Sequence, residues 1–100
     1  MLLQIAQRQV EPDITVVELT GKMALGPESQ QIESLVEELV RKGTHRLIVD
    51  LTGVGYIDSV SIGMFAMAAS KVKESGGKLA LVVAEGRVLQ LFNLTLRAFS

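Results

Sequence analysis

Two short apolar runs, separated by a segment of helical character, constrain the fold of this chain more than any other feature. They read RLIVDLT over residues 46–52 and KLALVVA over residues 78–84. Short uninterrupted apolar runs rich in branched side chains are typical of buried strands. Parallel strands joined through a helix have a right-handed crossover. We therefore expect residues 46–52 to form a central strand and residues 78–84 another buried strand of the same sheet.

Three segments have the spacing of helices. The first covers residues 27–42, where apolar side chains recur at i, i+3, i+4 and i+7. The second is expected to run from residue 59 or 60 to residue 74, where a pair of glycines follows and stops it. The third is EGRVLQLFNLTLRAF, residues 85–99, in which the weak helix formers Asn93 and Thr95 are expected to mark the end.

The chain opens with a predicted hairpin. The runs LLQIAQRQV and ITVVELTG are separated by Pro12 and Asp13, which favour a tight turn. The expected order is thus β-β-α-β-α-β-α, an α/β sandwich with a mixed, mostly parallel sheet and helices packed on it. A chain of 100 residues buries only about 60 to 70% of its unfolded surface, which favours a single domain over residues 1–100.

Composition excludes several classes of function. A net charge of −1 provides no basic field for a phosphate backbone, so no nucleic-acid partner is expected. The longest apolar runs, residues 64–69 and 79–84, are far shorter than the roughly 20 residues that cross a bilayer, so no direct membrane insertion is expected. The start has no basic opening region or long apolar core of a secretion signal, and the absence of cysteine fits a cytoplasmic protein.

A turn, TGVGYID at residues 52–58, is expected between the central strand and the second helix. The stretch YIDSVSIGMFAM, residues 56–67, places serines at this junction but lacks catalytic motifs. The α/β-hydrolase pattern G-x-S-x-G is absent, and the only histidine, His45, lies in a polar turn with no orienting partner. Neither G-x-x-x-x-G-K-[ST] nor G-x-G-x-x-G occurs. Asp50 and Asp58 supply too few ligands for a metal ion. We therefore predict no enzyme activity, no catalytic residue, no cofactor and no metal.

Two interpretations of Asp58 and Ser59 remain open. In the first, they cap a helix by accepting hydrogen bonds from its free N–H groups. In the second, a phosphate on a serine at this helix start meets the positive end of the dipole and crowds Asp58, which could switch off an interface.

The second helix adds a candidate binding surface. Projected at 100° per residue, four residues share the face expected on the sheet, and four lie opposite. The sheet-facing set is Ile62, Phe65, Ala66 and Ala69, and the opposite set is Met64, Met67, Ala68 and Lys71. Exposed methionines often form adaptable binding surfaces. The alternative is that a neighbouring helix covers them.

The stretch LIVDLTGVGYIDSVSIGMF resembles the signature of the STAS domain family. The likeness extends from the opening hairpin through GKMALGPES to GKLALVVAEGRVLQLFNLTL. It implies a non-catalytic binding module of the anti-sigma factor antagonist type. Such proteins bind an anti-sigma factor, often a serine kinase that phosphorylates them and so breaks the complex. The alternative that the resemblance implies is a subunit of a lipid-transport or stressosome-type complex, without a phosphorylation switch.

The resemblance also implies site residues. The usual family turn is Asp-Ser-Ser-Gly, with the second serine as phosphate acceptor. Here Asp58 and Ser59 match, Val60 occupies the acceptor position, and Ser61 replaces the glycine, which leaves Ser59 and Ser61 as phosphorylation candidates. The residues expected to bind the partner protein are Asp58, Ser59, Val60, Met64, Met67 and Lys71.

Family members usually add a last strand and a final helix after the segment that matches LTLRAF, residues 94–99. This sequence stops at Ser100 before them. From the sequence we therefore expect the last helix to be missing, and we hypothesise a homodimer in which a second copy covers the surface left open.

Overall fold

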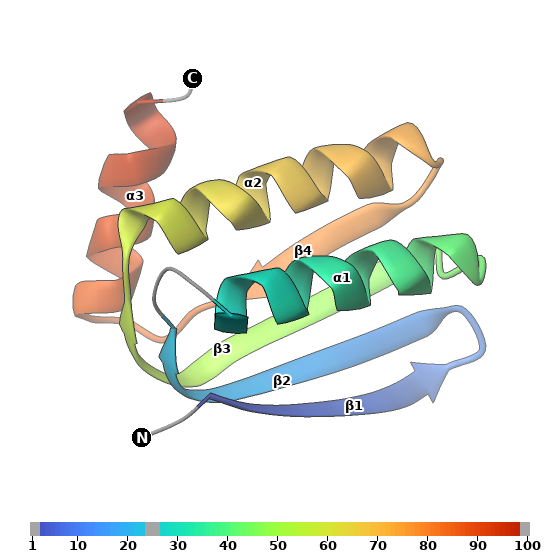
Figure 1. Cartoon of the computed structure of the whole chain (residues 1–100), viewed down its shortest axis with the longest axis horizontal. Helices are drawn as coiled ribbons and strands as arrows, with labels where there is room; N and C mark the ends of the chain where they lie inside the picture. Colours follow the sequence, from blue (N-terminus) through green and yellow to red (C-terminus); the bar gives the residue numbers. More distant parts are fainter. Residues whose placement is uncertain (1–2, 24–26, 99–100) are drawn as a thin grey trace.

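The computed structural model describes residues 3–23 and 27–98, which form four strands and three helices in the predicted order (Figure 1). The elements are β1 (Gln4–Glu11), β2 (Ile14–Met23), α1 (Pro27–Arg41), β3 (Arg46–Ile57), α2 (Ser59–Glu74), β4 (Lys78–Val82) and α3 (Arg87–Ala98).

One sheet has the strand order β1-β2-β3-β4. The hairpin strands β1 and β2 are antiparallel and turn at Pro12 and Asp13, while β2, β3 and β4 are mutually parallel. The predicted α/β fold, with a mixed and mostly parallel sheet opened by a hairpin, is therefore confirmed. Strand β3 lies inside the sheet, as expected for its apolar run.

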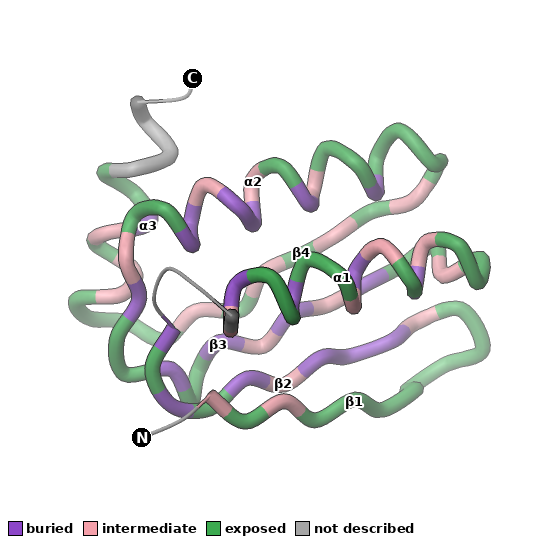
Figure 2. Tube along the Cα trace, in the orientation of Figure 1, coloured by how far each residue is buried: buried purple, intermediate pink, exposed green. Residues whose placement is uncertain are grey.

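Helices α1 and α2 lie side by side on one face of the sheet, and their inner sides are buried (Figures 1 and 2). The core between the two layers takes Leu47, Val49 and Leu51 from β3, and Ile62 and Phe65 from α2. Helix α3 packs beside α2, where the ring centroids of Phe65 and Phe92 are 6.4 Å apart. The burial of Ile62 and Phe65 agrees with the prediction for this helix.

Three predictions about the elements are wrong. Residues 53–57 were expected to form a turn but belong to β3, because their backbone continues to pair with β2 past an irregularity after Glu18. Strand β4 is half-buried instead of fully buried, since it lies at the edge of the sheet. Helix α3 continues through Asn93 and Thr95 to Ala98, so low helix propensity does not end it.

Candidate functional site

The start of α2 is capped by Asp58, which confirms the capping interpretation for this residue, whereas Ser59 is the first residue of the helix. Asp58 has an extended backbone, with φ −99° and ψ 167°, and its Oδ1 accepts a hydrogen bond of 2.8 Å from the Ser61 N–H. Its own N–H donates to the Met23 carbonyl oxygen at 3.3 Å. The helix start is therefore attached to the end of β2 as well as to its own first turn.

The two serines on either side of Val60 have different environments. Ser59 is exposed at the first position of α2. Ser61 is fully buried, and its Oγ lies 3.0 Å from Oγ of Ser29 in the first turn of α1. A kinase could reach Ser59 in the folded chain, whereas it could reach Ser61 only after α2 moves away from α1.

The predicted outer face of α2 is only partly correct. Met67 is 64% exposed and Val60 is 54% exposed, but Met64 and Ala68 are buried. The reason is that α1 and α3 both contact α2, so burial extends around the flank that carries Met64. Conversely, Ala66 and Ala69, which were expected on the sheet, are only half-buried.

One line along the helix carries Val60, Met67 and Lys71, because these residues are spaced at intervals of seven and four residues. Lys71 is exposed, and its Nζ lies 3.2 Å from Glu37 Oε1 on α1. This exposed ion pair links the two helices and contributes little stability. We call Ser59, Val60, Met67 and Lys71 the outer face of α2.

Tyr56, two residues before Asp58, is an exposed aromatic residue that sequence reasoning missed. Its side chain is 52% exposed, whereas the next residue, Ile57, is buried. The sequence predicts a turn here and therefore gives no burial pattern for these residues. The buried residues of this part of β3 are Leu51, Val54 and Ile57, every third position, so simple strand alternation does not place Tyr56 either.

The structure gives no support for a catalytic serine. His45 precedes β3 and Ser59 follows it closely, so a twelve-residue strand separates them at about 3.3 Å per residue. Within the part of the chain that is described, no group of three or more histidine, cysteine, aspartate or glutamate residues could hold a metal ion. Among the described helices, none has the length and apolar character needed to cross a bilayer.

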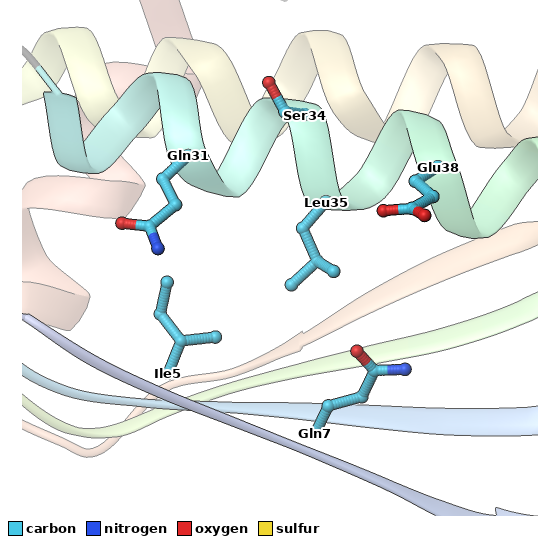
Figure 3. A pocket seen from close by; sticks show the side chains of 6 residues that line it. All are labelled: Ile5, Gln7, Gln31, Ser34, Leu35 and Glu38. Carbon is cyan, nitrogen blue, oxygen red and sulfur yellow. The ribbon is translucent and has the colours of Figure 1, made fainter.

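A groove of about 390 Å³ lies between β1 and α1 (Figure 3). It is lined by Ile5, Gln7, Gln31, Ser34, Leu35 and Glu38. The two amides can donate and accept hydrogen bonds, but the lining contains no cation or histidine. None of the residues predicted to bind a partner lies in it.

Removal of the cap should weaken the fold modestly. We expect Asp58→Ala to lower the free energy of unfolding by about 1 kcal/mol, because the Ser61 N–H loses its acceptor. Urea denaturation followed by circular dichroism measures the change. Ser59→Ala is the matched control and should change stability by less than about 0.5 kcal/mol, since it is exposed. Equal losses in the two variants would contradict the assignment of the cap.

The STAS domain family model matches residues 6–97. An anti-sigma-B factor antagonist from Staphylococcus epidermidis is 26% identical over 65 residues, which are 65% of this chain and 60% of that relative's length. The solved structure of a putative anti-sigma factor antagonist from Thermotoga maritima is 23% identical, with a TM-score of 0.80 over 95% of this chain and 80% of the other. The structure of the Bacillus cell fate determinant SpoIIAA in its phosphorylated form is 14% identical, with a TM-score of 0.72 over 92% of this chain and 83% of the other. At these identities the two structures show a common fold.

Proposed function

Because the chain belongs to the STAS domain family, we propose that it is an anti-sigma factor antagonist, a non-catalytic cytoplasmic module that binds an anti-sigma factor. We take residues 1–100 as one domain for this purpose. The similarity to the staphylococcal anti-sigma-B factor antagonist supports the proposal, although the aligned part spans 60% of that relative.

The observation that carries the proposal is the exposure of Val60 and Met67 directly behind the capped start of α2. Large apolar side chains in line on a helix supply the kind of contact that dominates the binding energy of an interface. Methionine also adapts its shape to a partner surface. Tyr56, which is 52% exposed, precedes Asp58 and Ser59 in the chain, and the exposed Val60 and Met67 follow them.

We further propose that a partner kinase, if it switches the complex, phosphorylates Ser59. Val60 has no hydroxyl, and Ser61 is buried against Ser29, which leaves Ser59 as the accessible candidate of the two. A phosphate there adds about two negative charges next to the Asp58 carboxylate, in the middle of the proposed interface. Incubation with the kinase and ATP, followed by mass measurement, tests this. Ser59→Ala should abolish the added phosphate, and persistence of the phosphate in this variant would contradict the assignment.

One observation favours a second candidate function, an unswitched STAS subunit of a lipid-transport or stressosome-type complex. Val60 stands at the position where the family usually has the acceptor serine, and valine cannot be phosphorylated. In that case incubation with a partner kinase and ATP would add no phosphate, and partner binding would be retained. Phosphorylation of Ser59 that abolishes binding to an anti-sigma factor would instead support the switched antagonist.

A charge on the outer face of α2 should disrupt partner binding. We expect Met67→Glu to weaken binding to the anti-sigma factor by at least about tenfold, because a carboxylate must then be buried in an apolar contact. Isothermal titration calorimetry measures the affinity. Val10→Glu makes the same change at a residue that is 50% exposed on β1 and should leave the affinity unchanged. Equal affinities of Met67→Glu and the unmodified chain would disprove the proposed surface.

A further inference from the structure

The sheet has a second face, which the described helices leave open (Figure 1). Side chains alternate along each strand, so the neighbours of the core residues Leu47, Val49 and Leu51 point away from the helices. In the three parallel strands, the residues of this open face are Ile14, Val16 and Glu18 of β2, Arg46, Ile48 and Asp50 of β3, and Lys78, Ala80 and Val82 of β4. Of these, Ala80 is exposed and Val82 is 44% exposed.

Strand register orders the open face into three rows. Arg46 pairs with Ile14 and Lys78, which makes a basic row. Ile48 pairs with Val16 and Ala80 in an apolar row. Asp50 pairs with Glu18 and Val82 in an acidic row. The charges of the face are therefore separated along the strands, with the apolar row between them.

The two charged residues of β3 are equidistant from Ile48. Arg46 lies two residues before Ile48 and Asp50 lies two residues after it, about 6.6 Å along the strand in each direction. Consider a two-fold axis that runs parallel to the face and perpendicular to the strands and passes above Ile48. This axis places Arg46 of each copy opposite Asp50 of the other. An axis parallel to the strands would instead stack like charges on one another.

A hollow at the basic end of this face can receive the opposing row. Its volume is about 200 Å³. It is lined by Ile14, Arg46, Leu47, Ile48, Lys78 and Ala80. The walls are thus mostly apolar with two cations, a combination that suits a carboxylate and an apolar side chain together. The acidic row supplies that pair, since Asp50 and Val82 are neighbours across β3 and β4.

We propose that the open face of the sheet binds a second copy of this chain across that two-fold axis, with Asp50 and Val82 of each copy seated against Arg46 and Lys78 of the other. Sheets that pack face to face lie about 10 Å apart, a distance that these side chains span. Isologous contacts of this kind close a dimer without further growth. In the apolar row, the exposed Ala80 and the half-buried Ile48 meet their own symmetry mates, whereas Val16 is already buried within its own chain.

Arg8 of β1 pairs with Val16 and so lies in the central row, where the axis places it opposite its own symmetry mate. Its ion pair with Glu18 offsets this positive charge. Glu18 is already paired with Arg8 at 2.7 Å, so the free negative charge of the acidic row resides on Asp50. The Thr52 N–H donates to Asp50 Oδ1 at 2.9 Å and lowers the pKa of this carboxyl, which keeps it ionised at neutral pH. Arg46 makes an ion pair with Asp13 at 3.6 Å between exposed side chains, a weak contact that can rearrange.

The proposed dimer goes beyond the proposed function and does not depend on it. Helices α1 and α2 cover the other face of the sheet, so the outer face of α2 stays free in both copies (Figure 1). A dimer would therefore present two partner-binding surfaces on opposite sides. The surface differs from the one suggested by the sequence, where a missing helix was the reason for expecting a homodimer.

Charge reversal tests the dimer without any partner protein. Sedimentation equilibrium of the unmodified chain at low salt, up to about 1 mM, should give twice the chain mass of 10.8 kDa. Arg46→Asp and Asp50→Arg, measured separately, should each weaken dimerisation by at least about tenfold, since like charges then face each other across the axis. An equimolar mixture of the two variants should form a heterodimer, because one carries only acidic and the other only basic residues at these positions.

The mixture also controls for misfolding, since two unfolded variants would not recover association with each other. A monomeric unmodified chain over the whole concentration range would overturn the proposal. It would also be overturned if both single variants dimerised as well as the unmodified chain, or if the mixture of folded variants remained monomeric.

Discussion

Replacement of Ser61 with aspartate is expected to destabilise the chain strongly, whereas the same substitution at Ser59 should change its stability little. Ser61 is fully buried between the starts of α1 and α2, with its Oγ 3.0 Å from Ser29 Oγ. A carboxylate at this position would be buried next to the Asp58 carboxylate, which accepts the Ser61 N–H. An uncompensated buried charge destabilises by about 3–5 kcal/mol. The free energy of unfolding of a small domain is only about 5–15 kcal/mol in total.

Urea denaturation followed by circular dichroism measures this difference. Ser61→Asp should lower the midpoint strongly, and Ser59→Asp should shift it little because its side chain is exposed. Ser61→Ala removes the hydrogen bond without adding a charge, and it should destabilise the chain by only about 1 kcal/mol. Similar midpoints for Ser61→Asp and Ser59→Asp would mean that the first turn of α2 is more open than the structure describes.

This comparison also bears on the proposed switch. A phosphate on Ser61 would carry about two negative charges into the site where one is already destabilising. Phosphorylation of Ser61 would therefore act by separating α2 from α1, whereas phosphorylation of Ser59 would act on the surface alone. The two serines, which the sequence leaves as equal candidates, thus correspond to different physical mechanisms.

The sequence predicts the order of elements because each strand and helix has its own local signal. The apolar run around Val49, the turn at Pro12 and the cap at Asp58 each depend on residues close in the chain. These features are confirmed. The irregular extension of β3 to Ile57 was missed because its pairing with β2 involves residues more than thirty positions earlier, and its glycines indicate a turn when taken alone.

The faces of α2 could not be predicted from the helix itself. Its apolar residues surround most of the circumference, so projection at 100° per residue does not select one side. Contacts with α1 and α3 decide the question and bury Met64, while Met67 remains outside. Burial of Ser61 has the same origin, since its hydroxyl partner, Ser29, is supplied by another helix. A helix that is apolar all round needs its neighbours before its binding face can be identified.

The glycine pair after α2 was predicted as a stop signal, but the two glycines have different reasons to be glycine. Gly76 has φ +91°, a left-handed conformation that ends the helix. Gly77 lies against the backbone at the start of β3, where a Cβ atom would be 2.4 Å from the His45 carbonyl oxygen. The same oxygen accepts the Lys78 N–H at 2.7 Å, and the pairing of β4 with β3 begins there with Arg46.

Gly77→Ala is therefore expected to destabilise the chain by about 1–3 kcal/mol, because a backbone carbonyl group cannot move aside as a side chain would. For a domain of this size each 1 kcal/mol lowers the melting temperature by about 4–8 °C, which calorimetry can measure. Gly55→Ala is the matched control, since a Cβ atom at this exposed strand position meets nothing within 4 Å. It should leave the melting temperature unchanged or raise it slightly, through loss of conformational freedom in the unfolded chain. If Gly77→Ala also melted like the unmodified chain, β4 would not be anchored at His45, and the register on which the rows of the open face depend would be wrong.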